Sequence, residues 1–349
     1  MLALLMLIAI SASWSENIYT AIRTLSLLSV SYFLICTYIS VSDINEAVSL
    51  ISKTIIAMLI ACLLMCLIVP EYGISVGGEY AGAWQGIFNH KNNLGNFAAF
   101  SFCILVGTSH LKKSGILYFG MILAAFLAWK SNSFTSIAAV CSVVILSIVM
   151  KERTSLAVFF RIRKVYFITL ILLSVLAVYI SVFNQGMTIF NKDTSFSSRN
   201  LIWGFVLQKS LANPFGYGIS QFQNYLTGRD TSLFYSVGFS VAHSHNGFIE
   251  ILYATGIIGL FLSIASLLST LKDSILHINF RLNVFAITSI VIINTFEARF
   301  ISFDFGFFVI CFVTCFSKKI LNLLKSSSSS SNKKSFDFSI PQLQDKNSQ

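Results

Sequence analysis

Charged residues are scarce in this sequence. Of its 349 residues, 11% are charged and 55% are hydrophobic, and the mean hydropathy is +0.77. A soluble domain carries about 25% charged residues, so this composition excludes water as the main solvent of the chain. The sequence also lacks the segments of about 10 alternating apolar and polar residues that a membrane β-barrel needs. It has continuous apolar runs instead, which predict membrane-spanning helices.

Clustered charge and close cysteine spacing are lacking as well. The formal net charge is +10, but the Lys and Arg residues are spread over short loops, which argues against a nucleic-acid partner. All seven cysteines fall inside apolar runs, and none forms a CxxC pair. Cys62 with Cys66, and Cys311 with Cys315, share helix faces at i,i+4 and are expected to be packing residues. The cysteines therefore predict neither a disulfide framework nor a metal site.

The apolar runs predict an all-α fold, a polytopic membrane helix bundle of about ten transmembrane helices with one large extracytoplasmic loop. The first run lacks the basic segment of a secretory signal, so we expect it to be retained as a span. Residues 1–325 would form this multi-pass domain, and the Ser-rich tail 326–349 has too few apolar residues to fold. The expected spans are 1–13, 20–41, 51–69, 93–109, 115–129, 133–150, 165–184, 246–270, 283–296 and 305–318.

The loops between these runs alternate in charge. Basic residues accumulate in every second loop, and such residues favour the cytoplasmic side of a membrane. This pattern predicts that both termini are cytoplasmic and that the segments 70–92, 185–245 and 297–304 lie outside.

The predicted outside loop 185–245 contains an arginine and a tryptophan on one short helix. Ser197 or Ser198 could cap a helix that runs from Arg199 to about Leu211. Trp203 is at i+4 from Arg199, so the cation and the indole share a face. Taken alone, this pair is better explained by an interfacial anchor than by a substrate site, because arginine is common near lipid headgroups.

Two histidines come just before the next apolar run. His243, His245 and Asn246 precede a predicted span, and a neutral imidazole there could accept a proton from a substrate at the membrane surface. Arg229 lies in the same loop. Of the usual metal ligands, Glu250 alone is near the two histidines, so a metal site is the less favoured interpretation.

Two further polar groups stand at the ends of predicted spans. His90, Lys91, Asn92 and Asn93 enter one span, at a cost in lipid unless they face a cavity or bind a headgroup. In NTFEARF, Glu297 and Arg299 follow another span; they could pair with each other or with nearby charges.

In chain order, these motifs resemble the O-antigen ligase and polysaccharide polymerase superfamily, above all its exopolysaccharide-production branch. The segment SASWSENIYTAIRT resembles an early Trp-Ser element with a following arginine, Arg23. The other matching segments are GAWQGIFNHKNNLG, SSRNLIW with NPFGYG, HSHNGFIEILYATGIIG and NTFEARF. The resemblance covers roughly residues 10–320.

The resemblance implies a glycosyltransferase of the bacterial inner membrane. It would transfer a glycan from a polyprenyl-pyrophosphate donor to a sugar hydroxyl of a second lipid-linked repeat unit, without a metal or a cofactor, in O-antigen, capsule or exopolysaccharide synthesis. Its expected partners are the lipid-linked oligosaccharide, membrane lipid and, as a candidate, a chain-length regulator.

The implied chemistry assigns roles to the polar residues. His245 would be the base, and Arg199 would stabilise the pyrophosphate leaving group. Arg299, Arg229, Lys91 and Arg23 are lesser candidates for the leaving group, and His243 or His90 would position sugar. Asn92, Asn246, Trp203 and Glu297 complete the expected substrate-binding set. A ligase that uses a lipid core or another anchor as acceptor remains open, as does a flippase that only moves the lipid-linked sugar.

Overall fold

The structure is a computed structural model. It describes residues 1–110, 113–149, 169–170, 172, 176, 179, 188–189, 192–193, 199–226, 228, 231–238, 241–275, 281–301 and 305–330. The predicted span 165–184 and the predicted tail 326–349 therefore lie largely outside the described residues, and Arg229 lies entirely outside them.

The described part of the chain is almost wholly helical. Two short pairings are extended: β1 (Thr188–Ile189) pairs antiparallel with β2 (Lys192–Asp193), and an isolated antiparallel bridge joins Ile74 to Trp84. The bundle helices are α1 (Leu2–Ser11), α2 (Ile18–Val41), α3 (Ile44–Ile68), α5 (Lys91–Ser109), α6 (Gly115–Lys130), α7 (Phe134–Val149), α12 (Gly247–Ile275), α13 (Arg281–Phe296) and α14 (Phe305–Ser330). The other helical elements are η1 (Ala12–Trp14), α4 (Pro70–Gly73), η2 (Gly78–Tyr80), α9 (Arg199–Ala212), α10 (Gln221–Leu226) and α11 (Ser232–Val237).

The apolar helices fit a membrane. Three of them are long and apolar enough to cross one by length and composition: Ile18–Val41, Ile44–Ile68 and Gly247–Thr270. On α2, the large apolar side chains of Val30, Phe33 and Leu34 are each more than half exposed, which is costly in water and favourable in lipid. The chain is therefore a helical membrane protein. The predicted count of about ten spans stays a prediction.

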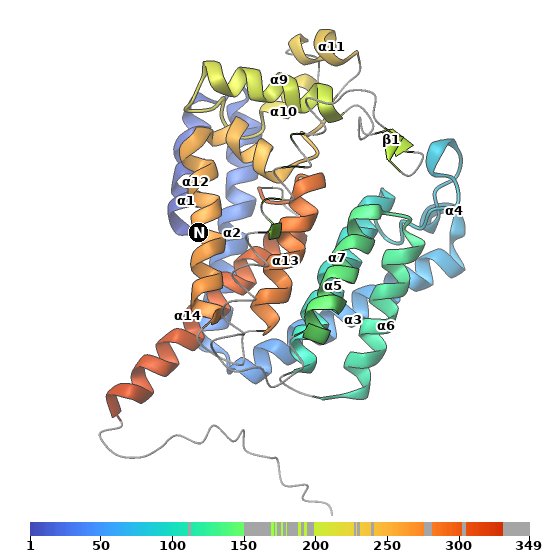
Figure 1. Ribbon diagram of the computed structural model, residues 1–349, viewed down its shortest axis with the longest axis vertical. Helices are drawn as coiled ribbons and strands as arrows, with labels where there is room; N and C mark the ends of the chain where they lie inside the picture. The colour runs from blue at the N-terminus through green and yellow to red at the C-terminus, as the bar shows by residue number, and fades with distance from the viewer. Residues whose placement is uncertain are drawn as a thin grey trace, which may run out of the picture.

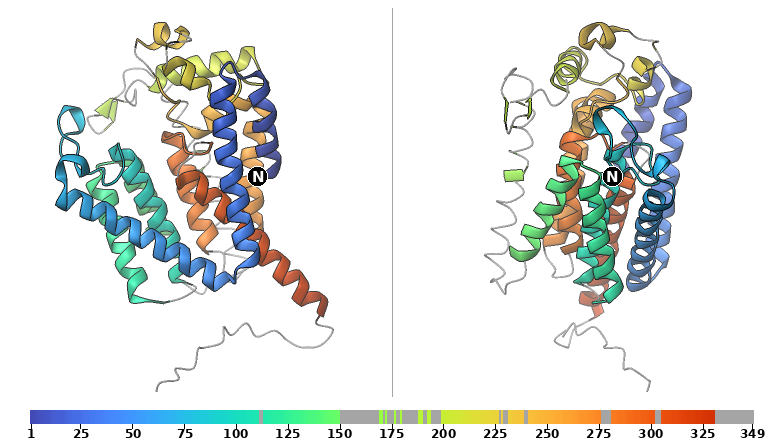
Figure 2. Two further views of the ribbon diagram at one scale, coloured as in Figure 1. Left: turned by 180° about the vertical axis from the view of Figure 1, so that it is seen from behind. Right: turned by 90° about the vertical axis from the view of Figure 1, so that its right-hand side faces the viewer.

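Helix α13 lies at the centre of the bundle. It packs against α5 and α7 on one side and against α12 and α14 on the other, as Figures 1 and 2 show. Every residue from Leu282 to Thr295 is buried, as expected of a helix surrounded by other helices. Its buried hydroxyls bond back to its own carbonyls, for example Thr288 to Val284 at 2.8 Å. The buried hydroxyls of this central helix therefore find hydrogen-bond partners within the helix itself.

Helices α9, α10 and α11 lie across one end of the bundle (Figure 1). This end holds the turn Asn213–Gly218, which docks into a break in α12. The break is at Gly256, whose φ of 69° and ψ of −167° form a backbone conformation that essentially only glycine adopts. The carbonyls of Tyr253 and Ala254 that the break frees accept hydrogen bonds from the backbone N–H groups of Tyr217 and Gly218, at 2.8 and 2.9 Å. The NPFGYG and GIIG motifs thus meet.

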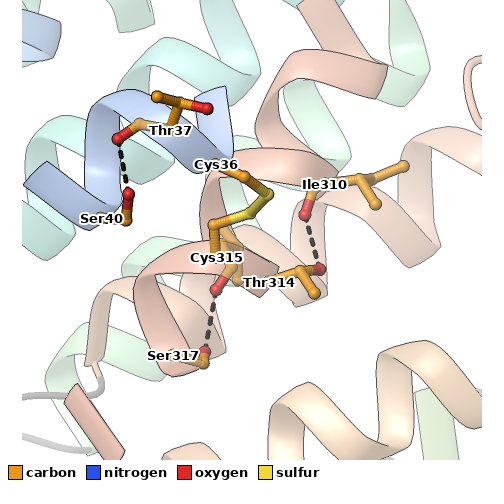
Figure 3. The surroundings of a disulfide bond; sticks show 8 residues. Cys36, Thr37, Ser40, Ile310, Thr314, Cys315 and Ser317 are labelled. Atoms are coloured by element: carbon orange, nitrogen blue, oxygen red, sulfur yellow. Dashed lines mark hydrogen bonds between the residues drawn. A yellow bond between two sulfur atoms is a disulfide. The ribbon is translucent and has the colours of Figure 1, made fainter. Parts of the chain in front are cut away.

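The cysteine prediction is partly wrong. Cys62, Cys66 and Cys311 are buried, as expected of packing residues. Cys315, however, forms a disulfide with Cys36, which joins α14 to α2 (Figure 3). The two cysteines are 279 residues apart, so the i,i+4 spacing of Cys311 and Cys315 carried no information about this partner.

Candidate active site

Three helix N-termini meet the C-terminal end of α13. The last carbonyls of a helix have no partner within it, and here side chains from α12 and α9 supply partners. The Asn246 amide donates to the Thr295 carbonyl at 2.9 Å, and Arg199 Nη1 donates to the Phe296 carbonyl at 2.5 Å. From α5, Asn92 Nδ2 donates to Glu297 Oε1 at 2.8 Å. The positive ends of three helix dipoles therefore converge on residues 295–297.

Glu297 is the centre of this arrangement. Its side chain is only 3% exposed, and besides Asn92 it contacts Arg199, Arg299 and His245. Arg199 Nη2 lies 3.3 Å from Oε1, while Arg299 Nη2 lies 3.8 Å from Oε2. Burial alone would raise the pKa of Glu297, but the His245 ring and the two guanidinium groups lower this pKa to about 2. Glu297 is therefore a carboxylate at neutral pH.

The two arginines outweigh this single carboxylate. The side chains of Arg199 and Arg299 are 16% and 17% exposed, so neither is sealed inside the protein. Arg299 also donates to Asn93 Oδ1 on the first turn of α5. Two cations against one anion leave a net positive charge, which suits binding of an anionic group.

The entrance to α5 borders the same cluster. His90 caps the helix, since its Nδ1 accepts from the Asn92 backbone N–H at 3.1 Å. Burial lowers the pKa of His90, and nearby Lys91 and Arg299 lower it further against the opposing effect of Glu297. Lys91 Nζ donates to the Asn132 carbonyl at 3.1 Å and lies 4.4 Å from the ring centre of Tyr80.

The histidine loop brings two imidazoles to Glu297. His245 Nδ1 lies 3.9 Å from Glu297 Oε2, at ion-pair distance, and the His245 side chain is 33% exposed. The backbone of His245 has a φ of 56°, a left-handed conformation that is uncommon outside glycine. The His243 ring lies edge-to-face with it, with 4.1 Å between centroids. Burial, and then the neighbouring His245, lowers the pKa of His243 to about 3, so His243 is neutral at physiological pH.

Four residues around the loop hold it in this shape. Asn246 caps α12 through hydrogen bonds from the N–H groups of Phe248 and Ile249, at 2.9 and 3.0 Å. The fully buried Trp203 donates its indole N–H to the Ser244 carbonyl at 2.7 Å. Glu250 Oε2 accepts from both the backbone N–H and the hydroxyl of Ser244, each at 2.9 Å. These contacts fix the backbone on both sides of His245.

Most of the predicted site residues are brought together. Arg23 is different: it is exposed on α2, and no contact described for it joins it to the cluster. Trp203 shares α9 with Arg199, but it lies beneath the loop, in a buried cluster with Tyr253. The residues that assemble are His90, Asn92, Asn93, Arg199, His243, His245, Asn246, Glu297 and Arg299. The Lys91 ammonium is directed to the Asn132 carbonyl and the Tyr80 ring.

Sequence reasoning missed two supporting residues, Ser244 and Glu250. Ser244 lies between the histidines, and Glu250 was weighed only as a stray metal ligand. The available signal was the position of Glu250 in the first turn of a predicted helix, where a carboxylate is stabilised and can reach the preceding loop.

An all-helical membrane bundle with arginines, a glutamate and a histidine at one end is the architecture that the motif resemblance implies. The comparison with protein families agrees with it: residues 97–264 match the model described as O-antigen ligase. This range runs from α5 to the middle of α12 and includes Arg199 and both loop histidines.

A curated relative points to the same group of proteins. The chain is 27% identical over 267 residues to the exopolysaccharide production protein ExoQ of Rhizobium meliloti (strain 1021). The match covers 72% of this chain and 58% of that relative's length. Together the two matches confirm the resemblance to the O-antigen ligase superfamily, on the exopolysaccharide-production side.

Proposed function

We propose that this chain is a polysaccharide polymerase. It transfers a glycan from a polyprenyl-pyrophosphate-linked donor to a hydroxyl of a second lipid-linked repeat unit. The reaction takes place on the extracytoplasmic side of a bacterial inner membrane. The observation that carries the proposal is the convergence of Arg199, Arg299 and His245 on the buried carboxylate of Glu297.

The acceptor hydroxyl is a poor nucleophile, and His245 is positioned to activate it. With Nδ1 turned toward Glu297, the other ring nitrogen, Nε2, takes the proton as the acceptor oxygen attacks the anomeric carbon of the donor. The carboxylate orients the ring and stabilises the imidazolium that forms. His243, neutral and at ring contact, can accept or donate a hydrogen bond to the sugar.

The pyrophosphate leaves with the electron pair of the broken carbon–oxygen bond. Negative charge therefore grows on the leaving oxygen, and the guanidinium groups of Arg199 and Arg299 stabilise it through paired hydrogen bonds. The helix N-termini of α5 and α9 add favourable potential at the same place. The products are a glycan longer by one repeat on the acceptor lipid and a free polyprenyl pyrophosphate.

A ligase would share this donor chemistry and differ in its acceptor. The polymerase is favoured because the curated relative is an exopolysaccharide production protein. A flippase would also need basic residues along its path, but it has no use for a histidine oriented by a carboxylate beside two arginines.

Reconstitution discriminates among these functions. The purified protein is placed in liposomes with lipid-linked repeat units extracted from cells that lack this gene, and the glycans are separated by length. A polymerase produces a ladder of longer glycans on polyprenyl lipid. An unchanged glycan length, with lipid-linked units that only change leaflet, would establish transport and end the proposal.

A further inference from the structure

A polar cavity lies beside the histidine loop, apart from the arginine cluster. It has a volume of about 140 Å³, room for several water molecules at about 30 Å³ each. Ala242, just before the histidines, and Ile301, two residues after Arg299, both line it. The cavity therefore borders two of the segments that form the proposed active site, the histidine loop and the residues after α13.

The lining has the chemistry of a neutral, hydroxyl-rich ligand. The hydroxyls of Thr20, Thr24 and Ser220 and the carboxylate of Glu250 offer donors and acceptors, while Phe222 and Tyr253 supply aromatic surface. The Thr24 and Ser220 hydroxyls hydrogen-bond each other at 3.1 Å and can also bond to a polar ligand, whereas an isoprenoid chain could form no hydrogen bond with this lining.

Charge separates this cavity from the leaving-group site. Its described lining contains one carboxylate, that of Glu250, and neither lysine nor arginine. A pyrophosphate would be repelled here and attracted to Arg199 and Arg299. The cavity and the arginine cluster thus favour ligands of different charge.

We propose that this cavity holds the acceptor sugar, so that its hydroxyl is presented to His245 from the side opposite the donor pyrophosphate. This inference rests on the proposed polymerase function. Glu250 then links binding to catalysis, because the carboxylate that lines the cavity also accepts hydrogen bonds from Ser244, the residue before His245.

Cysteine protection tests the cavity without relying on turnover. Thr24→Cys is introduced together with Cys141→Ser, which removes an exposed native thiol, and the variant is labelled with a maleimide in liposomes. The protecting ligand is the repeat-unit oligosaccharide released from its lipid by mild acid; bare polyprenyl pyrophosphate is the comparison. Thr37→Cys in the same background is the matched control, because Thr37 lies on the same helix but outside the cavity lining.

The oligosaccharide should slow labelling of the Thr24→Cys variant severalfold and leave labelling of the Thr37→Cys variant unchanged, whereas bare polyprenyl pyrophosphate should protect neither variant.

Thr24→Val should raise the KM for the free oligosaccharide as acceptor about fivefold, the effect of one hydrogen bond, without lowering kcat. Protection by the bare lipid, or no protection by either ligand, would overturn the inference. If wild-type protein in the same liposomes polymerises, the polymerase proposal survives that outcome.

Discussion

Replacing Glu297 by glutamine tests whether the buried carboxylate organises the site. Glutamine keeps the shape but removes the charge that Arg199, Arg299 and His245 surround. Lowering the pKa from its ordinary 4.5 to about 2 corresponds to roughly 3–4 kcal/mol of stabilisation, at about 1.4 kcal/mol per pKa unit. We therefore expect Glu297→Gln to lower the free energy of unfolding by roughly that amount, because two guanidinium groups lose their partner.

The pH dependence of this loss has a definite sign. A carboxyl group with a lowered folded-state pKa stabilises the fold fully above its unfolded-state pKa and loses this effect as the pH falls toward the folded-state value. The stability difference between wild type and Glu297→Gln, measured by unfolding in detergent, should be present at neutral pH and shrink as the pH falls below about 4.5. Glycan transfer should fall by about 10²-fold or more, since the base loses its orientation. A variant as stable and active as wild type would refute the central role of Glu297.

Three further predictions concern the leaving-group arginine, the break in α12 and the membrane topology. Arg199→Lys keeps the charge but loses the two-donor fork, so glycan transfer in the liposome assay should fall by about 10²-fold. Arg281→Lys is the control, because Arg281 is at the opposite end of α13, about 24 Å from Glu297 along the helix axis, and this variant should transfer at nearly the wild-type rate. Equal rates for the two variants would contradict the leaving-group role of Arg199. Gly256→Ala places a Cβ 2.0 Å from the Pro214 carbonyl at a φ of 69° and should cost about 3 kcal/mol in thermal unfolding, whereas Gly204→Ala, with open space around it, should be neutral or stabilising. A reporter enzyme active only outside the cytoplasm should work at Lys192 and fail at Lys334, and the reverse result would invert the predicted orientation.

The hydrophobic and capping patterns of the sequence predicted the positions of the helices well. The expected helix from Arg199 to about Leu211 is α9, Arg199–Ala212, and the expected spans 20–41 and 133–150 correspond to α2 and α7. Continuous apolar runs and polar caps act within a few residues, so the sequence alone carries this information.

The centre of the site could not be predicted in the same way. Glu297 meets Asn92 across 205 residues and Arg199 across 98, and such long-range contacts depend on how the helices pack. The sequence offered His245, Arg199 and Glu297 as separate candidates, and the burial of α13 makes Glu297 their common partner. The disulfide between Cys36 and Cys315 escaped prediction for the same reason.

The most direct test of the account is glycan transfer by His245→Ala in liposomes with purified lipid-linked repeat units, at matched protein levels. His245 lies in a loop and is a third exposed, so insertion and folding should be preserved, and His110→Ala, at the other end of α5, serves as control. The account predicts that His245→Ala lowers the transfer rate by about 10²–10⁴-fold, the range of general-base catalysis, while His110→Ala retains the wild-type rate. Wild-type transfer by His245→Ala would contradict the assignment of the base and, with it, the proposed mechanism.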